Sequence, residues 1–284
     1  MQLHTINTGF FKLDGGAMFG VVPQQMWKKL NPPDENNMCT WAMRCLLVQT
    51  DDGRNILIDT GLGDKQDAKF RSHFEPHGAA TLLHSLAEKG LQPDDITDVF
   101  LTHFHFDHVG GAVSRNANGE LLPTFAKAKY WTNKPHYDWA LQPNPREKAS
   151  FLKENFVPLL DHNVFNFIDI QEGIEIYDGF SAHFAFGHTE ALMTPHIQIG
   201  NRTLVYCADL LPSVGHIGLP YVMAYDIRPL ETMREKETLL RNAAEQNWLL
   251  YLEHDPINEC CTVRFNEKGQ VVLDKTMSLA DFMV

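Results

Sequence analysis

The sequence predicts a fold in which β-strands and α-helices alternate along a single domain, residues 1–284. Short apolar runs with a strand-like composition alternate with segments whose apolar residues have helical spacing. Hydrophobic residues make up 44% of the chain and charged residues 21%, which is ordinary for a protein with a substantial core. Four predicted strands each lead to a histidine or an aspartate, and polar strand ends of this kind favour a functional site.

The first half of the chain predicts a hairpin, a helix and a short buried strand, in that order. The hairpin has Asp52-Gly53 at its turn, a common two-residue turn signal. The helix stops before Gly90, a residue that suits the position after a helix. The short strand leads directly to His103. These elements cover residues 45–50 and 55–59 for the hairpin, 81–89 for the helix and 99–102 for the strand.

The second half repeats this arrangement. Three predicted strands, 182–187, 203–207 and 249–252, lead to a histidine, an aspartate and a histidine. Between the last two strands, residues 229–248 have a helical rhythm. We expect the charged run 234–237 to be a solvated face of this helix. The stripe expected to be buried comprises Leu230, Met233, Leu239, Leu240, Ala243 and Ala244.

Composition limits the functional classes. The net charge of −12 argues against a nucleic-acid partner, because such proteins usually carry a basic face. No apolar run approaches the roughly 20 residues that cross a bilayer, and the N-terminus does not have the pattern of a signal peptide. The five cysteines form no CxxC pair, which favours a reduced, cytoplasmic protein.

The most informative motif is a cluster of imidazoles and a carboxylate after the strand 99–102. Residues two apart in an extended segment point the same way, so His103 and His105 can bind one metal ion from one side. Imidazole nitrogen and carboxylate oxygen are ligands of zinc and similar divalent metals. Asp107 and His108 follow too closely to bind the same ion easily, which indicates a second metal beside the first.

The run His103-Phe104-His105-Phe106-Asp107-His108 resembles the HxHxDH motif of the metallo-β-lactamase-fold hydrolases. Further short motifs of that superfamily match in the same order along the chain: Ile58-Asp59-Thr60-Gly61, Gly187-His188-Thr189, Ala208-Asp209-Leu210 and Glu253-His254-Asp255. The resemblance covers most of the chain. It implies an α+β fold, a four-layer αββα sandwich of two mixed sheets packed face to face with helices outside.

The resemblance also implies a metal centre with two divalent ions, zinc in the first place and iron or manganese as alternatives. His103, His105 and His188 would hold the first ion, Asp107, His108 and His254 the second, and Asp209 would bridge the two. A hydroxide shared by ions about 3.5–4 Å apart would then attack a carbonyl or phosphoryl centre. Asp59 is expected to orient a ligating histidine instead of binding metal.

Two departures from the family pattern concern the residues around this centre. After His188 the chain lacks the glycine and second histidine of HTxGH, so this loop is expected to differ. The tyrosine that lactonases of the superfamily often place just after the bridging aspartate is also absent. The catalytic candidates are therefore Asp107, which is also a metal ligand, and His216 or Tyr221, with Tyr225 as a further candidate.

The leading functional hypothesis is a metal-dependent hydrolase of a small ester, lactone or related substrate. The chain resembles the branch of this superfamily that contains quorum-quenching lactonases and methyl-parathion-type hydrolases. Alternatives are a phosphotriester or phosphodiester hydrolase, an iron-dependent redox member, a nucleic-acid nuclease and a non-catalytic metal binder. Flavodiiron proteins, which are iron-dependent redox members of the superfamily, have a glutamate at the position where this chain has His105.

The expected partner is a small-molecule substrate, with no nucleic acid and no membrane. Residues 115–178 are rich in proline, asparagine and aromatic residues and are expected to include a cap over the site. The apolar stretch 15–20, with Met26 and Trp27, carries no predicted ligand. It is expected to pack at a homodimer interface or over the mouth of the site.

Overall fold

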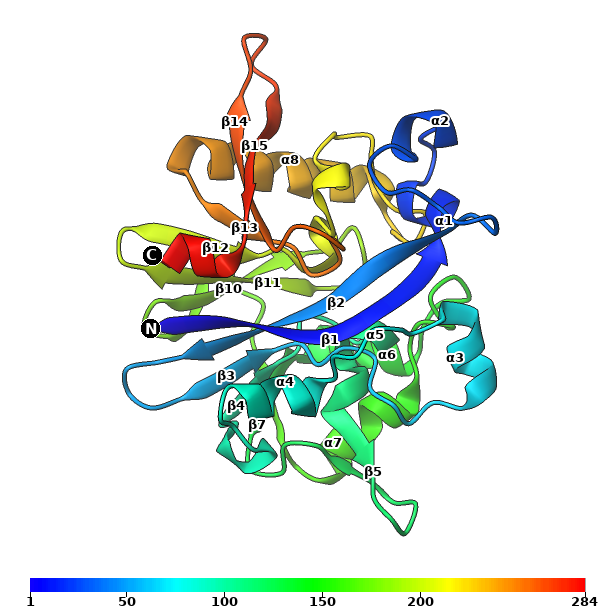
Figure 1. Cartoon of the computed structure of the whole chain (residues 1–284). Coiled ribbons are helices and arrows are strands. Elements are labelled where there is room, and N and C mark those ends of the chain that lie inside the picture. Colours follow the sequence, from blue (N-terminus) through cyan, green and yellow to red (C-terminus); the bar gives the residue numbers. More distant parts are fainter. Residues whose placement is uncertain (284) are drawn as a thin grey trace. The chain divides into compact units, whose positions relative to one another are not determined.

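The computed structural model describes residues 1–283, and its contacts divide the chain into two compact units. The first unit contains Met1–Phe10 and Met43–Ile170, and the second contains Phe11–Ala42 and Gln171–Val284. Strands β1 (Gln2–Asp14) and β2 (Met38–Gln49) contribute residues to both (Figure 1).

The first unit is built on a mixed six-stranded sheet. Strands β2 and β3 form the predicted antiparallel hairpin, with Leu46 opposite Ile58. From β3 onward the neighbouring strands are parallel. The order across the sheet is β1, β2, β3 (Asn55–Ile58), β4 (Asp98–Phe100), β7 (Lys129–Asn133) and β8 (Phe165–Ile168).

Helices of the first unit connect these parallel strands, because parallel neighbours need a crossover connection. The predicted helix is α4, whose N-terminus is capped by the Thr81 hydroxyl and which ends before Gly90, a residue with φ of +78°. A small hairpin pairs β5 (Val113–Arg115) with β6 (Leu121–Pro123). The helices are α3 (Ala68–Phe74), α4 (Leu82–Glu88), α5 (Phe106–Val109), α6 (Lys134–Leu141) and α7 (Val157–Asp161).

The second unit is built on a mixed seven-stranded sheet. Within the described residues, β12 and β13 pair in parallel and are joined through the long helix α8 (Pro229–Gln246), whereas the other neighbouring strands pair antiparallel. Its remaining helices are α1 (Gly15–Phe19), α2 (Gln24–Trp27) and α9 (Leu279–Met283). The strand order is β15 (Val271–Met277), β14 (Cys260–Phe265), β13 (Leu249–Tyr251), β12 (Arg202–Tyr206), β11 (Leu192–Ile199), β10 (Phe180–Ala185) and β9 (Ile174–Tyr177).

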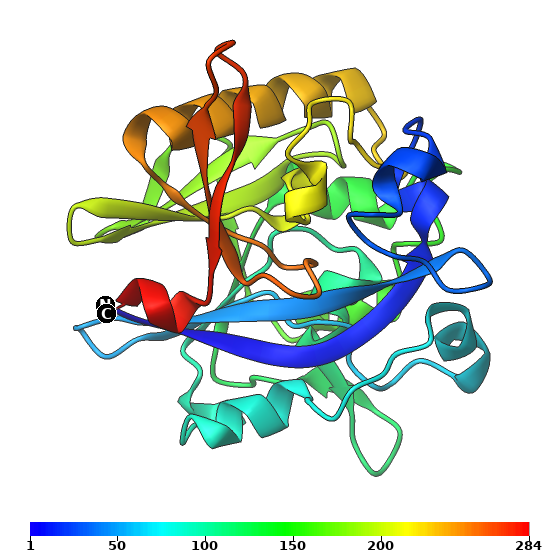
Figure 2. The same ribbon diagram turned by 45° about the horizontal axis from the view of Figure 1, so that its top comes forward.

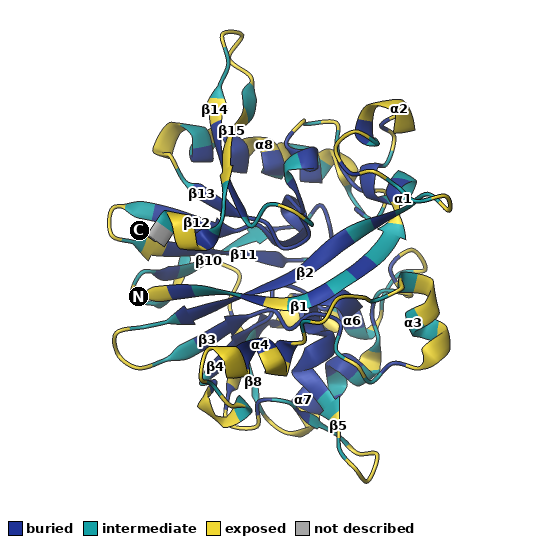
Figure 3. Cartoon of the chain, viewed as in Figure 1, coloured by how far each residue is buried: buried dark blue, intermediate teal, exposed yellow. Residues whose placement is uncertain are grey.

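Helix α8 (Pro229–Gln246) packs along one face of this sheet, in contact with β14 and β15 (Figures 1 and 2). The predicted helix is confirmed, but two expectations about its faces are wrong. Leu230 is 70% exposed, because it lies in the first turn and outside the buried stripe. Lys236, expected on a solvated face, is 1% exposed. The stripe that is buried consists of Thr232, Lys236, Leu239, Leu240 and Ala243 (Figure 3).

The core of the first unit lies between its sheet and helices α4, α6 and α7. Leu57 and Tyr130 from the strands pack with Leu86, Tyr137 and Leu159 from these helices, and all five are buried. Among the described residues, none of the helices has both the length and the apolar character that crossing a bilayer requires.

The single domain and the cap within 115–178 both stay predictions. Within that range the structure places strands β7 and β8 of the six-stranded sheet and helices α6 and α7. The apolar N-terminal stretch folds into α1 and α2, where Phe19 and Trp27 are buried and stack on each other, while Met26 is 54% exposed.

Candidate metal centre

Three predicted ligands of the second unit lie at one edge of its sheet. Because β10 and β12 are each antiparallel to β11, they run in the same direction, and β13 is parallel to β12. The carboxyl ends of these three strands therefore share an edge. His188, Asp209 and His254 are each the third residue after the end of one of these strands. The topology thus brings these three side chains together.

Asp209 lies between the two histidines, with one carboxylate oxygen directed to each. Its Oδ2 is 3.0 Å from His188 Nε2, and its Oδ1 is 2.9 Å from His254 Nε2. All three residues are buried. The preceding residue, Ala208, has φ of +45°, a left-handed conformation that strains an alanine and is typical of functional sites. The Asp209 carboxylate therefore contacts two imidazole nitrogens, one through each of its oxygens.

The outer nitrogens of the same histidines face acceptors. His188 Nδ1 lies 2.8 Å from Asp226 Oδ1, and His254 Nδ1 lies 2.7 Å from the carbonyl of Ala42. Since a carbonyl can only accept, His254 Nδ1 must carry a proton, and Nε2 is the nitrogen directed at Asp209. Burial alone lowers the pKa of His188, but the carboxylates of Asp209 and Asp226 outweigh it and raise that pKa to about 10. The region around His188 therefore attracts positive charge.

The loop that carries His188 is held by two charged side chains from around the start of α8. The Glu235 carboxylate accepts from the backbone N–H groups of Phe186 at 2.6 Å and Gly187 at 3.0 Å. The Arg228 guanidinium donates to the carbonyl of Phe186 at 2.6 Å and to Glu190 at 2.8 Å. These contacts fix the direction in which the strand end presents its imidazole.

In the first unit, the predicted ligands follow β4, and His103 is again the third residue after the strand. His103 Nε2 lies 3.1 Å from His105 Nδ1, so these two nitrogens face a common point. The Thr102 hydroxyl gives its one proton to Asp59 Oδ2 at 2.6 Å and accepts from His103 Nδ1 at 3.1 Å. This hydrogen-bond chain leaves the Nε2 lone pair of His103 for a metal ion.

Asp59 also holds His108, as the sequence predicts for a residue that orients a ligand. Its Oδ2 lies 3.0 Å from His108 Nδ1, which again leaves Nε2 available, and its Oδ1 accepts from the backbone N–H of Thr102 at 2.8 Å. Asp107 lies in the first turn of α5, with its Oδ2 3.8 Å from His108 Nε2. All four residues are buried.

We expect Asp59→Asn to weaken metal binding by about 10–100-fold, the usual effect of removing a partner of a ligating histidine. An amide nitrogen at either oxygen position would face N–H or O–H donors, so the chain from Asp59 to Thr102 and His108 would break. Chelator competition measures the change. Thr102→Val keeps the contact between Asp59 and His108 and should lose less; equal losses would argue against this role for Asp59.

The turn after His108 requires glycine because backbone segments approach each other closely. A Cβ on Gly110 would lie 1.9 Å from the carbonyl oxygen of Leu62, and one on Gly111 would lie 2.3 Å from that of Thr60. Thr60 in turn donates its N–H and its hydroxyl to the carbonyl of His108, at 2.7 and 2.8 Å. These two glycines therefore permit the loop after β3 to approach and support the loop that carries His103 to His108.

Gly110→Ala is expected to lower the free energy of unfolding by about 1–3 kcal/mol, the usual effect of overpacking. The added methyl would meet backbone, which cannot move aside as a side chain can. Urea denaturation measures the change. Gly90→Ala is the control, since its Cβ meets nothing within 4 Å and only its φ is unfavourable. Equal stability of the Gly110 variant and the wild type would contradict the prediction.

The two other catalytic candidates lie in the second unit. His216 is buried, with Nδ1 2.8 Å from the Ser213 hydroxyl and Nε2 2.9 Å from the carbonyl of Met18, and it stacks on Phe19. Burial lowers its pKa to about 3. Tyr221 packs edge-on against Phe19. One ring nitrogen of His216 thus contacts Ser213 in its own turn and the other contacts Met18 of α1, and catalytic roles for His216 and Tyr221 stay predictions.

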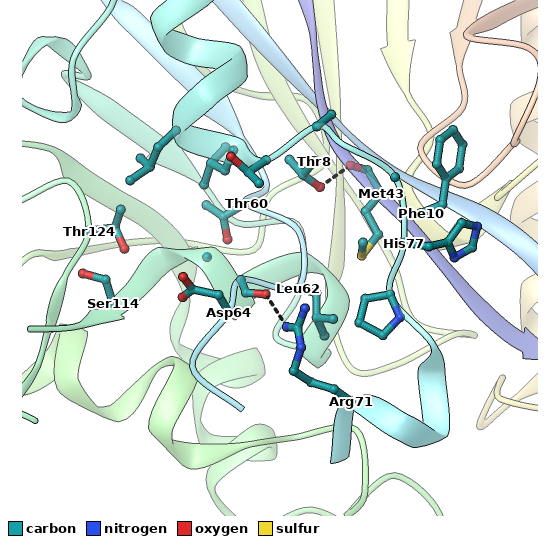
Figure 4. Close-up of a pocket in the computed structure, with 18 of the residues that line it drawn as sticks. Thr8, Phe10, Met43, Thr60, Leu62, Asp64, Arg71, His77, Ser114 and Thr124 are labelled. Carbon is teal, nitrogen blue, oxygen red and sulfur yellow. Dashed lines mark hydrogen bonds between the residues drawn. The ribbon is translucent and has the colours of Figure 1, made fainter. Parts of the chain in front are cut away.

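A cavity of about 300 Å³ lies elsewhere in the first unit (Figure 4). Apolar side chains such as Leu62 line it together with hydroxyls such as Thr60, and Arg71 donates to the carbonyl of Gly63 at its rim. None of the predicted ligands of this unit is among its lining residues. The cavity therefore does not contain the predicted ligands, although Thr60 and Gly111 in its lining adjoin the turn after His108.

The donors of both units suit a divalent metal. They are imidazole nitrogens and carboxylate oxygens, all buried, and acceptors on the outer nitrogens of His103, His108, His188 and His254 leave Nε2 of each ring to face a metal ion. Sequence reasoning missed Asp226 and Glu235, because neither lies in a motif and only the folded chain brings them to the His188 loop.

Comparisons with known proteins agree with the family resemblance of the motif. The model of the Metallo-beta-lactamase superfamily matches residues 44–254. A probable metallo-hydrolase of Mycobacterium tuberculosis is 26% identical over 266 residues, which cover 84% of this chain and 82% of that protein.

Two solved structures are similar over nearly the whole chain. A probable metal-dependent hydrolase from Staphylococcus aureus has 27% identity and a TM-score of 0.85, and 98% of each chain is covered. AidC, a dizinc quorum-quenching lactonase, has 21% identity and a TM-score of 0.78, with 97% of this chain and 95% of that chain covered. The likeness to AidC concerns the fold alone. Together they confirm the fold that the HxHxDH resemblance predicts.

Proposed function

Because the chain belongs to the metallo-beta-lactamase superfamily, we propose that it uses two divalent metal ions to hydrolyse a small ester or lactone. It is a metal-dependent hydrolase of this superfamily. The number of ions, their identity as zinc and the class of substrate are the proposed parts. The ligands are those predicted from the motif: His103, His105, Asp107, His108, His188, Asp209 and His254.

The observation that carries the proposal is the position of Asp209 between His188 and His254. Its two oxygens face two different imidazoles at nearly equal distances, 3.0 and 2.9 Å. The motif assigns these imidazoles to different metal ions. A carboxylate that serves one ion alone has no need of this arrangement, so it supports a bridged pair.

Each residue then has a definite task. The metal ions that these residues would hold would supply Lewis acidity, polarising a substrate oxygen and lowering the pKa of a bound water to about 7. His103 and His108 present Nε2 lone pairs, because Thr102 and Asp59 accept their outer protons. Asp209 lowers the net positive charge, as Asp107 would beside His108. These residues set the geometry and charge on which hydrolysis depends.

The lactone and ester class is proposed from the chemistry of the donors and from the structural relatives. AidC, with a similar fold, is described as a dizinc lactonase in complex with N-hexanoyl-L-homoserine. We carry that class of substrate to this chain as a proposal. Phosphotriesters stay in the test as the alternative predicted from the sequence. A cytoplasmic location and the possible homodimer remain proposals that rest on the sequence.

The test combines metal analysis with a substrate panel. Protein expressed with added zinc should contain two divalent ions per chain by elemental analysis. It should hydrolyse members of a panel of acyl-homoserine lactones, aryl esters and phosphotriesters, and His108→Ala should lose that activity. Fewer than one divalent ion per chain would overturn the proposal, and turnover of phosphotriesters alone would correct its substrate class.

A further inference from the structure

His105 differs from the other ligating histidines in the nitrogen that it directs toward the metal position. His103, in the same loop, directs Nε2, whereas His105 directs Nδ1, as the 3.1 Å contact between these two atoms shows. The outer nitrogen of His105 is therefore Nε2. The Glu147 carboxylate faces it, with Oε1 3.7 Å from Nε2.

Glu147 is held at this point by two donors on its other oxygen. The indole N–H of Trp139 donates to Oε2 at 2.8 Å, and the side-chain amide of Asn144 donates to the same oxygen at 2.5 Å. Glu147 is 2% exposed. A buried carboxylate is costly unless it is hydrogen-bonded and faces positive or donating groups. Here one oxygen has two donors, and the other is directed at the imidazole.

The segment that carries Glu147 is also attached to the metal-binding loop. The carbonyl of Ser150 accepts from the backbone N–H of Phe106, next to His105, at 3.0 Å. The ring of Phe151 packs on the His105 ring with centroids 4.8 Å apart. From α6, His136 Nε2 accepts from the backbone N–H of Phe104 at 2.8 Å. Residues on both sides of His105 are thus fixed, one to α6 and the other to the segment that follows it.

We propose that Glu147 is a positioning residue that keeps the proton of His105 on Nε2 and so leaves Nδ1 to bind metal. This inference rests on the proposed metal-dependent function. At 3.7 Å the carboxylate and imidazole are at ion-pair distance, and metal binding that draws on Nδ1 makes Nε2–H a stronger donor toward Oε1. Trp139 and Asn144 supply the fixed anchor that directs Oε1.

Glu147→Gln is a sharp test because the anchor dictates how the amide must turn. Trp139 and Asn144 both donate, so the amide oxygen must take the Oε2 position. The amide nitrogen then faces His105 Nε2, and a donor replaces an acceptor with little change in size. Trp139→Phe is the second variant. It removes the indole donor but keeps an aromatic ring, and it leaves the His105 contact atoms in place.

The experiment measures zinc affinity by chelator competition and the protonated nitrogen of His105 by ¹⁵N NMR of histidine-labelled protein. We expect Glu147→Gln to bind zinc about 10–100-fold more weakly and to lose the Nε2–H signal of His105. The zinc affinity of Trp139→Phe should lie between that of Glu147→Gln and that of the wild type. Glu245→Gln on the exposed side of α8 removes one charge elsewhere and should match the wild type. Thermal unfolding verifies that each variant is folded.

The outcomes separate this inference from the function on which it rests. Unchanged zinc affinity and an unchanged His105 tautomer in folded Glu147→Gln overturn the role of Glu147, even if the wild type hydrolyses the panel. A wild type that binds two zinc ions but hydrolyses nothing overturns the proposed function and leaves the Glu147 effect measurable. A wild type that binds no zinc overturns both.

Discussion

Replacing Asp209 by alanine is expected to lower kcat for any substrate of the panel by at least about 10²–10³-fold, the scale of removing an electrostatic group that acts in the transition state. The effect should be large because both oxygens of this carboxylate are engaged, one with His188 and one with His254. Its removal leaves two imidazoles without the anion that they share. Steady-state kinetics and metal content, measured on the same preparations, report the change.

The control for this variant is Asp169→Ala, an exposed aspartate that should leave both metal content and kcat unchanged. Loss of activity in Asp209→Ala together with loss of at least one metal ion is the expected result. Retention of activity with two bound ions would count decisively against a bridging role for Asp209.

The sequence predicts the fold class, but it does not predict every strand around the proposed ligands. Each unit brings together the donors that its motifs contain, because a strand end fixes where the third following residue lies. Strand β1 was not predicted. Its buried residues are Leu3, Ile6, Gly9 and Phe11, a spacing of three, three and two that hides the alternation of a strand. Gly9 has φ of +98°, which departs from regular strand geometry.

Strand β11 was also missed, and Pro195 is the reason. A proline within an apolar run argues against a central strand, because it cannot donate to a neighbouring strand. Here Pro195 pairs with Ala182 of β10, but the pairing with β12 begins only at His196. The proline thus lies just outside the ladder with β12. Only the register reveals this, and the register depends on strands that are distant in the sequence.

Lys236 is the clearest case of a residue whose role depends on tertiary contacts. In a helix, successive residues are about 100° apart, so a run of four charged residues cannot all lie on one face. The buried stripe passes from Thr232 through position 236 to Leu239 and Leu240. Position 236 lies on this stripe but holds a lysine instead of an apolar residue. Lys236 is therefore a buried charged residue and not part of a solvated face.

The consequence is a large expected effect of Lys236→Met on stability. The ammonium group donates to three backbone carbonyls, those of His216 at 2.8 Å, Gly218 at 3.1 Å and Tyr221 at 2.7 Å. Methionine has a similar shape but no donor. Each of these hydrogen bonds contributes about 0.5–1.5 kcal/mol, and the buried His216 loses the donor to its carbonyl, so we expect a loss of about 3 kcal/mol in the free energy of unfolding. Urea denaturation measures it, with exposed Lys268→Met as the control.

The difference in unfolding free energy between the wild type and Lys236→Met should depend on pH, because burial lowers the pKa of Lys236 to about 7 from its ordinary 10.5. Between these two values the unfolded chain binds the proton and the folded chain releases it, so the stability contributed by Lys236 rises with pH. It is fully present above 10.5 and is lost as the pH falls through about 7. The wild type should therefore exceed Lys236→Met in stability by more at pH 9 than at pH 6. A difference that is constant over this range would show that the ammonium keeps its proton, because the three carbonyls offset the cost of burial.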